Sequence, residues 1–232
     1  MVPLLQNSMT KNLVAVVPVR KGSQRVKNKN FKPFCGKNLL IHKIEVLKKI
    51  NQISEIIINT DSDEAIKIAK DLGVSFKMRE KYYASSECTN SEFWSHIAET
   101  TDSSLIMFTN CTSPLVKEET YVKIIDSFRA SKSSNDSINT VTEIKEYLYL
   151  DNKPINFDPS KAPNSQNLPE IVKLNFAVNI LSKEHMFKMK SLIGNKPLFH
   201  KLDDIEGFDI NSNYEFEFAE YLFKKYSKNK KI

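Results

Sequence analysis

The chain has 232 residues, of which 41% are hydrophobic and 27% are charged, values that exclude a disordered or collagen-like chain. The formal net charge is +6, but residues 20–49 alone carry ten Lys or Arg residues and one acid. A nucleic-acid-binding protein more often spreads its charge along a face. We therefore expect a compact polyanion, such as a nucleoside triphosphate, beside this segment.

The spacing of cysteine and histidine residues indicates neither a zinc site nor a disulfide framework. The three cysteines and four histidines are scattered, and no Cys-x-x-Cys pair occurs, which favours free thiols in a reducing compartment. No segment has the length and hydrophobicity of a signal peptide or a membrane span. We therefore expect a cytoplasmic protein that binds neither nucleic acid nor a membrane.

Strands and helices alternate over the first 131 residues. Residues 13–19, "LVAVVPV", are apolar on both faces, as expected of a buried parallel strand. The same reasoning predicts strands at 54–61, 74–78 and 104–110, and helices at 38–50, 62–73, 92–100 and 118–131. This alternation predicts an α/β fold with a doubly wound, mostly parallel, Rossmann-like sheet.

The alternation fails between residues 138 and 174, where short β-like runs flank the proline-rich "DPSKAPNSQNLPE" of residues 158–170. We interpret this segment as a small inserted β-rich lobe or arm within a single domain of residues 1–232; an ordinary surface loop fits the composition nearly as well. Residues 173–181 return to the sheet, and residues 211–226 close the chain as an amphipathic helix.

The basic loop of residues 20–30 follows the first strand directly, at the end of the strand where open α/β sheets bind ligands. It is neither a Walker A loop nor a dinucleotide fingerprint, because Gly22 is its only glycine. Its hold on phosphate groups would come from side chains and from backbone N–H groups near Gly22 and Ser23. A solvated basic loop is the alternative.

The residue order in this loop, and in five later segments, resembles the acylneuraminate cytidylyltransferase family, which includes the CMP-sialic acid synthetases. Arg20-x-Gly22-Ser23 followed by Lys29-Asn30 resembles that family's R-x-G-S-K-G-x-x-x-K-N signature. Arg79 falls where the family has a base-contacting arginine. The later segments are "ASSECTNS" (84–91), "NCTSPL" (110–115), "QNLP" (166–169), "LNFAVNI" (174–180) and "DINSNYEFEFAE" (209–220).

The resemblance implies a nucleotidyltransferase that joins CTP to an acidic sugar of the sialic, legionaminic or pseudaminic acid type, for cell-surface polysaccharide biosynthesis. It assigns catalysis to Arg20, Lys29 and Asp209, and a magnesium or manganese ion to Asp209 and Asn211. An arm like the one expected here reaches across a homodimer in that family. The implied substrate-binding residues are Gly22, Ser23, Gln24, Arg25, Asn30, Arg79, Ser85, Ser86, Asn110, Thr112, Ser113, Gln166 and Asn175.

Several positions depart from the family's pattern. Gln24 and Arg25 stand where the family has Lys-Gly, so Arg25 is a candidate replacement for the missing lysine. Asn211 replaces an aspartate, and Phe176 replaces a glycine in a segment that contacts the acceptor in the family. A lone aspartate at position 209 would also serve as an ordinary helix N-cap.

Three other functions fit the composition. The first is a cytidylyltransferase that acts on a sugar or polyol phosphate and yields a CDP product. The second is a regulatory module that binds a nucleotide without turning it over. The third is a nucleic-acid-binding protein, whose affinity would depend steeply on salt.

Overall fold

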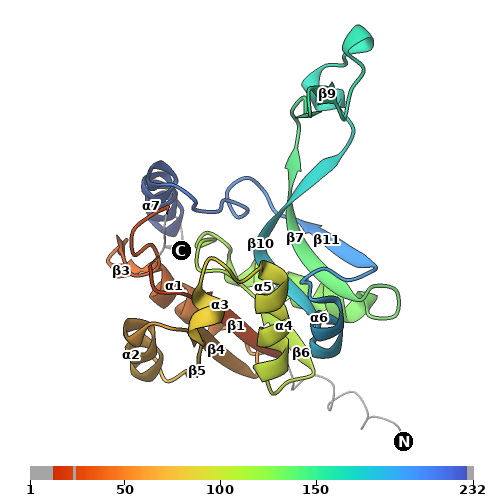
Figure 1. Ribbon diagram of the computed structural model, residues 1–232. Helices are drawn as coiled ribbons and strands as arrows, with labels where there is room; N and C mark the ends of the chain where they lie inside the picture. The colour runs from red at the N-terminus through yellow and green to blue at the C-terminus, as the bar shows by residue number, and fades with distance from the viewer. Residues whose placement is uncertain (1–12, 23–24, 229–232) are drawn as a thin grey trace, which may run out of the picture.

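A computed structural model describes residues 13–22 and 25–228 of the chain, and its centre is a seven-stranded sheet (Figure 1). The strand order is β11-β7-β10-β6-β1-β4-β5. Both pairings of β10 are antiparallel and the other four pairings are parallel, which confirms the mostly parallel sheet predicted from the sequence. The strands are β1 (Leu13–Val19), β4 (Glu55–Thr60), β5 (Ser75–Met78), β6 (Leu105–Phe108), β7 (Ser137–Ile144), β10 (Ile171–Ser182) and β11 (Pro197–Lys201).

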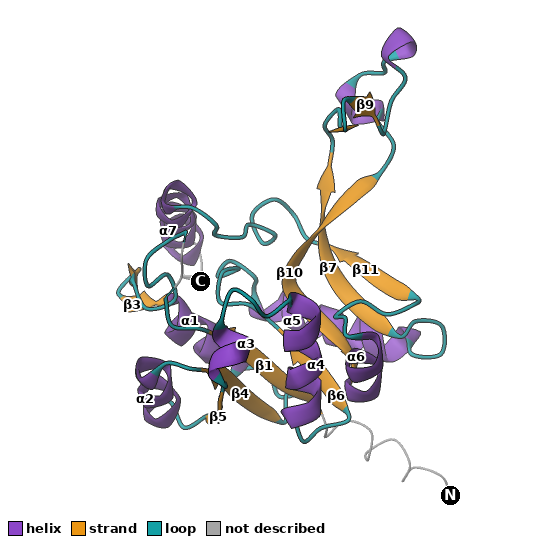
Figure 2. Cartoon of the chain, viewed as in Figure 1, coloured by secondary structure: helices purple, strands orange, loops and turns teal. Residues whose placement is uncertain are grey.

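Helices cover both faces of this sheet, as Figure 2 shows. The side chains of β1 alternate between two apolar cores: Ala15 and Val17 belong to one, Val14 and Val16 to the other. Such two-sided burial explains why β1 is apolar throughout. The first core includes residues of α1 (Leu39–Leu47), α2 (Asp63–Asp71), α5 (Glu118–Ser131) and α7 (Asn213–Lys228), and the second includes residues of α4 (Asn90–Thr100) and α6 (Lys183–Met189).

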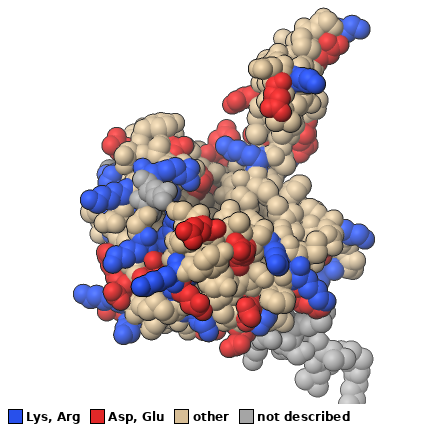
Figure 3. All heavy atoms as spheres, in the orientation of Figure 1, with Lys and Arg blue, Asp and Glu red and all other residues tan. Residues whose placement is uncertain are grey.

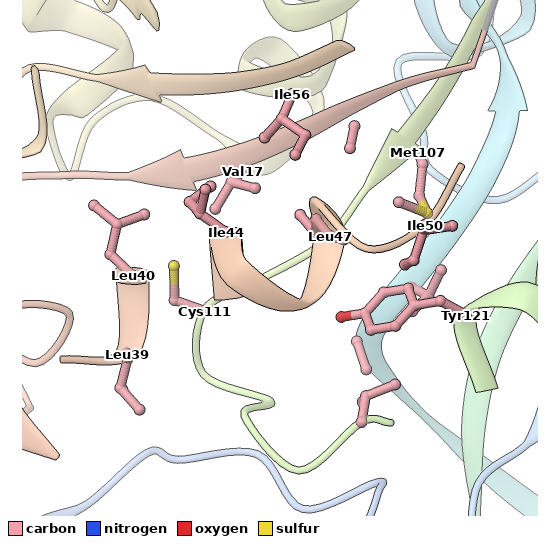
Figure 4. Close-up of a cluster of buried hydrophobic side chains, with 14 of the residues drawn as sticks. Val17, Leu39, Leu40, Ile44, Leu47, Ile50, Ile56, Met107, Cys111 and Tyr121 are labelled. Atoms are coloured by element: carbon pink, nitrogen blue, oxygen red, sulfur yellow. The ribbon is translucent and has the colours of Figure 1, made fainter. Parts of the chain in front are cut away.

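Helix α1 directly follows the basic loop and is fixed by its apolar face. Leu40, Ile44 and Leu47 are buried, as their helical spacing predicts, and Figure 4 shows them beside Val17 of β1. Full burial of one such side chain contributes roughly 1.5–3 kcal/mol. The side chain of Asn38 accepts a hydrogen bond from the Ile41 N–H and so caps the helix start. The basic loop is therefore held between two well-packed elements.

The remaining elements of the first half follow the predicted order with shifted ends. Ser62 caps α2, and Thr89 forms a capping box with Glu92 at the start of α4. Three short elements in this half were not predicted, because each has four residues or fewer: β2 (Pro33–Phe34), β3 (Lys37–Asn38) and α3 (Lys81–Ala84).

The segment interpreted as an inserted lobe divides into two parts. Residues 137–144 form β7, which pairs with β10 and β11 in the central sheet, so this stretch lies inside the sheet and not in a separate lobe. Residues 145–170 continue from β7 and β10 as an arm that stands away from the body in Figure 1. The arm carries β8 (Tyr149–Leu150), β9 (Lys153–Pro154) and two 3-10 turns (Pro159–Lys161 and Ser165–Asn167). The division into domains stays a prediction.

Candidate functional site

A cavity of about 470 Å³ lies at the carboxyl ends of the parallel strands, and we call it the first cavity. Arg20 follows β1, Arg79 follows β5 and Asn110 comes shortly after β6, so the fold brings these residues to one edge of the sheet. The volume of the first cavity lies within the usual range for small-molecule sites. The lining residues are Pro18, Arg20, Arg25, Val26, Lys29, Asn30, Arg79, Asn90, Asn110, Cys111, Thr112, Asp209 and Asn211.

The basic loop is anchored by two contacts, and its side chains Arg20, Arg25 and Lys29 line this cavity. Val26 is buried in the first core. The Lys21 N–H donates to the Asp61 carboxylate at 2.7 Å. Gly22 has a φ of 77°, a left-handed conformation that glycine adopts without strain. In Figure 3, Lys and Arg side chains, with Asp and Glu side chains among them, lie on the part of the body that carries α1 and α2.

Lys29 lies at the boundary between the basic loop and the last motif. Its Nζ donates to the Ile210 carbonyl at 2.5 Å, next to Asp209 in the chain. Burial lowers the pKa of Lys29, while the nearby Asp209 carboxylate acts in the opposite direction. This contact joins two segments 181 residues apart in the sequence, so a cation and a carboxylate that were predicted separately share one cavity.

Arg79 is buried, with 5% of its surface exposed. Its Nε donates to Asn59 Oδ1 and one terminal nitrogen donates to the Asn59 carbonyl, both at 2.7 Å. The guanidinium lies 4.2 Å from the centre of the Phe93 ring. Burial lowers the pKa of Arg79 to about 10, so it remains protonated at neutral pH. Arg79 therefore provides a fixed positive charge on the cavity wall.

The Asp209 carboxylate has one oxygen engaged and one without a partner. Asn211 Nδ2 donates to Asp209 Oδ2 at 2.7 Å, whereas Asp209 Oδ1 is buried and accepts no hydrogen bond from the described residues. Asn30 Oδ1 is likewise buried and unpaired within the described part of the chain, and both residues line the first cavity. Two unpaired oxygen acceptors in one cavity are the hard ligands that magnesium prefers.

The closing helix begins after Asp209, so this residue is not its N-cap. Helix α7 starts at Asn213, and Ser212 Oγ accepts from the Glu215 N–H at 3.3 Å. Glu215 in turn accepts from the Asn211 N–H and from Ser212 Oγ. The helix start is thus stabilised by Ser212 and Glu215, and Asp209 Oδ1 takes no part in it.

A buried lysine, Lys43, holds the loop after β6 in place. Lys43 Nζ donates to the Ser113 carbonyl at 3.0 Å and also contacts Tyr121 Oη. The Thr112 carbonyl accepts from the Ile210 N–H at 3.0 Å, which connects this loop to the segment of Asp209. Burial raises the pKa of the Cys111 thiol to about 12, so Cys111 is uncharged at neutral pH.

A second cavity of about 360 Å³ adjoins the first one and shares Asp209 and Asn211 with it. It has an apolar part, formed by Leu174, Phe176 and Phe208. Lys173 is the one cation among the described residues that line it. The complete lining is Thr142, Lys173, Leu174, Asn175, Phe176, Asp204, Gly207, Phe208, Asp209, Asn211 and Glu215.

Gly207 belongs to a tight contact in the wall of the second cavity. A Cβ atom at this position would lie 2.5 Å from Thr142 Oγ1 and 3.0 Å from the Asp203 carbonyl. The side chain of Asn175 is fully engaged beside it, because it accepts from Thr140 Oγ1 and donates to Thr142 Oγ1. This packing joins the chain before Asp209 to β7 and β10.

The residues predicted as site residues occupy three kinds of position. Arg20, Arg25, Lys29, Asn30, Arg79, Asn110, Thr112, Asp209 and Asn211 line the first cavity, and Asn175 lines the second. Ser23 and Gln24 lie outside the described residues. Gly22, Ser85, Ser86, Ser113 and Gln166 line neither cavity; the Ser85 hydroxyl donates to the Tyr82 carbonyl at 2.7 Å, and Gln166 lies on the arm.

Several lining residues were not identified from the sequence, among them Asn90, Lys173, Gly207 and Phe208. Asn90 is the first residue of α4, and Lys173 looks like an ordinary exposed strand lysine. Gly207 and Phe208 lie in an irregular loop shortly before Asp209. The rarity of glycine, with only five in the chain, was the one available signal for Gly207.

Comparisons with known proteins give the following matches. The family model described as Cytidylyltransferase matches residues 14–228. An N-acylneuraminate cytidylyltransferase of Escherichia coli O18:K1:H7 is 24% identical, over 96% of this chain and 54% of that protein. The post-translational flagellin modification protein B of Campylobacter coli is 23% identical, over 92% of this chain and 95% of that protein. The chain therefore spans about half the length of the first relative and nearly all of the second.

A solved structure of CMP:2-keto-3-deoxy-manno-octonic acid synthetase in complex with CTP has a TM-score of 0.69 against this chain. The two are 13% identical, and the match covers 93% of this chain and 99% of that one. This likeness confirms the nucleotidyltransferase fold. Within the described residues, no helix is long and apolar enough to cross a membrane, and no three His, Cys, Asp or Glu side chains form a cluster suited to a metal ion.

Proposed function

Because the chain belongs to the cytidylyltransferase family, we propose that it transfers CMP from CTP to the anomeric hydroxyl of an acidic sugar of the sialic, legionaminic or pseudaminic acid type. The observation that carries this proposal is the meeting of two cavities at Asp209. One cavity is cationic and suits a triphosphate. The other is smaller and suits a sugar.

In the proposed reaction the anomeric oxygen attacks the α-phosphorus, and the bond to the bridging oxygen of the β-phosphate breaks. Pyrophosphate leaves with that oxygen, and the proton of the hydroxyl passes to solvent. Such transfers depend on positioning and on neutralising the phosphate oxygens. Arg20 and Lys29 would carry out this neutralisation, together with Arg25 in place of the lysine that the family has.

The base would be recognised at the Arg79 side of the first cavity. Cytosine presents an acceptor at O2 and a donor at N4, and the fixed guanidinium of Arg79 supplies donors. Ser85 and Ser86, which line neither cavity in this structure, are proposed as further contacts to the base.

A divalent ion, magnesium or manganese, fits the two unpaired oxygens of Asp209 and Asn30. Such an ion would neutralise charge on the phosphates when bound. Asn211 was predicted as a second ligand, but its amide nitrogen faces the Asp209 carboxylate. We therefore propose that Asn211 orients Asp209 and that Asp209 supplies the one protein carboxylate, which is common for magnesium.

The acceptor would occupy the second cavity, with its carboxylate against Lys173. Lys173 is exposed and has no ion-pair partner among the described residues. Its position on β10 places it beside the shared wall that contains Asp209. The acidic sugar would thus be held at one end by a cation and presented to the nucleotide at the other.

We propose a cytoplasmic homodimer joined through the arm. The arm exposes large apolar side chains at Tyr149, Leu150 and Ile155, with 57%, 63% and 55% of their surfaces accessible. Tyr147 and Tyr149 both pack on Phe157. In a single chain this aromatic cluster is largely exposed to water, and contact with a second copy would bury it.

A pyrophosphate-release assay tests the function directly. Each nucleoside triphosphate is supplied with magnesium against a panel of sialic, legionaminic, pseudaminic and 3-deoxy-octulosonic acids, and the product mass is recorded. We expect pyrophosphate release with CTP and an acidic sugar, but not with the other nucleoside triphosphates. The product should have the mass of a CMP-sugar. Release with a sugar phosphate, giving a CDP product, would contradict the proposal, as would CTP binding without turnover of any acid.

A further inference from the structure

The position of Phe176 in the second cavity has a consequence for the choice of acceptor. We propose that Phe176 is a specificity-determining residue that favours acidic sugars whose side chain ends in a methyl group over those whose side chain ends in a hydroxymethyl group. This inference rests on the proposed function, because it concerns the acceptor of that same reaction.

The first observation is a backbone conformation that phenylalanine rarely adopts. Phe176 has a φ of 54°, which is costly for a bulky side chain and common for glycine. The pairing of β10 with β7 shifts register between Leu174 and Asn179, so Phe176 lies in an irregular stretch of the strand, which we call the bulge. Bulges beside active sites redirect a side chain, and strain of this kind concentrates at functional sites.

The second observation is that buried hydrogen bonds hold this bulge in place. Asn175 Oδ1 accepts from the Ala177 N–H at 3.1 Å and from Thr140 Oγ1 at 2.6 Å. Thr140 Oγ1 also accepts from the Val178 N–H at 3.0 Å. The bulge is therefore built into the sheet by residues on both sides of Phe176, and the phenylalanine is held in its unfavourable conformation by its neighbours.

The third observation is the location of the aromatic side chain. The ring of Phe176 lies 6.1 Å from the ring of Trp94 on α4, at an interplanar angle of 34°. Phe176 also lines the second cavity, together with Leu174 and Phe208. Phe176 also packs against the second core, and the part of the cavity that Leu174, Phe176 and Phe208 line is apolar.

An apolar wall discriminates between acceptors by the group placed against it. A methyl group loses nothing when it leaves water for such a wall, whereas a hydroxymethyl group must give up hydrogen bonds with water. Differences of one small group in a hydrophobic pocket change kcat/KM by roughly 10-fold to 200-fold. Lys173 would hold the carboxylate that both kinds of sugar share, so the choice between them falls to Phe176.

The test compares the wild type with Phe176→Gly and Phe176→Ala on two acceptors, a legionaminic acid with a methyl end and N-acetylneuraminic acid with a hydroxymethyl end. We expect the wild type to prefer the first in kcat/KM by about 10-fold to 100-fold. Both variants remove the ring, so both should reduce this preference to a few-fold. KM for CTP should stay unchanged, because Phe176 does not line the first cavity.

The two variants also test the backbone conformation. Only glycine relieves the positive φ, so Phe176→Gly should melt roughly 2–4 °C above Phe176→Ala. Phe199 on β11 is a matched control, since it is an exposed strand phenylalanine that is not among the residues with positive φ. There the order should reverse, with Phe199→Ala more stable than Phe199→Gly.

Each outcome decides a different question. Equal use of both acceptors by the wild type, or an unchanged preference in both variants, would overturn this inference while the proposed function stands. No turnover of any acid would overturn the proposed function, and the inference with it. Turnover with the expected preference in the wild type alone would support both.

Discussion

Four cationic side chains line the first cavity, against one carboxylate, whereas the second cavity has one cation and three carboxylates. The first cavity is built mainly from loops that follow parallel strands. The second is built from the bulged strand β10 and from the irregular chain before α7. The difference agrees with the proposed division of work, in which the cationic first cavity would hold the triphosphate and the second cavity, through its apolar part, would determine which acceptor is used.

The largest effect is expected where the two cavities coincide. Asp209→Asn keeps the size of the side chain and removes the charge that would hold a divalent ion, so turnover should fall by at least about 10³-fold, the equivalent of about 4 kcal/mol. CTP binding in the absence of metal should change less than about threefold, because Arg20, Lys29 and Arg79 remain. Calorimetry and the pyrophosphate assay measure the two effects.

Asp71→Asn provides the control, since Asp71 is exposed at the end of α2 and lines neither cavity. It should turn over at the wild-type rate. If Asp209→Asn turned over at the wild-type rate, Asp209 would have no role in the reaction. The wall that the two cavities share would then have no chemical function.

The next effect concerns the hydrogen bond that orients Asp209. Asn211→Ala removes the donor to Asp209 Oδ2, and loss of such an orienting partner typically weakens metal affinity by about 10-fold to 100-fold. Binding of Mn²⁺ with CTP, followed by electron paramagnetic resonance, measures this without turnover. Asn213→Ala, at an exposed position two residues on, should bind Mn²⁺ normally. Equal affinities in both variants would contradict an orienting role.

The fold was predictable wherever one short segment determines its own environment. The run at 13–19 is apolar on both faces because β1 packs on two cores, and Ser62 caps α2 through a bond three residues away. Residues 137–144 were harder to assign, because a strand that continues into an arm has no turn signal at the point where it leaves the sheet. Helix α6 and the edge strand β11 were also missed, although Ser182 caps α6 and Gly194 precedes β11, because each has seven residues or fewer.

The first cavity was predictable from the order of its motifs, and the second was not. Its wall joins residues near 142, 173–176 and 204–215, which come together only through the antiparallel pairing of β10. The letters "NFA" show that Phe176 replaces glycine, but they do not show that the backbone keeps a glycine-like φ. That follows from the hydrogen bonds of Asn175 and Thr140 across two strands.

A substitution of Arg25 tests whether this arginine replaces the lysine that the family has at the position of Gln24. Arg25→Ala should raise KM for CTP by about 10-fold, the effect of losing one charge-assisted contact to phosphate at a solvent-exposed position. Lys27→Ala is the matched control, because Lys27 is an exposed cation two residues away that does not line the first cavity. If both variants raise KM equally, the loop acts through its net charge and Arg25 holds no specific position.

The smallest effect is expected for a substitution of Lys173, which lines the second cavity. Lys173→Met should raise KM for the acidic sugar by about 5-fold, since an exposed ion pair contributes at most about 1 kcal/mol. KM for CTP should not change, because Lys173 lines only the second cavity. Lys173→Arg keeps the charge and should retain most of the affinity, while Lys196→Met, an exposed lysine before β11, should have no effect. A rise in KM for CTP instead would mean that the two cavities act as one continuous anion site, and the division of work between them would not hold.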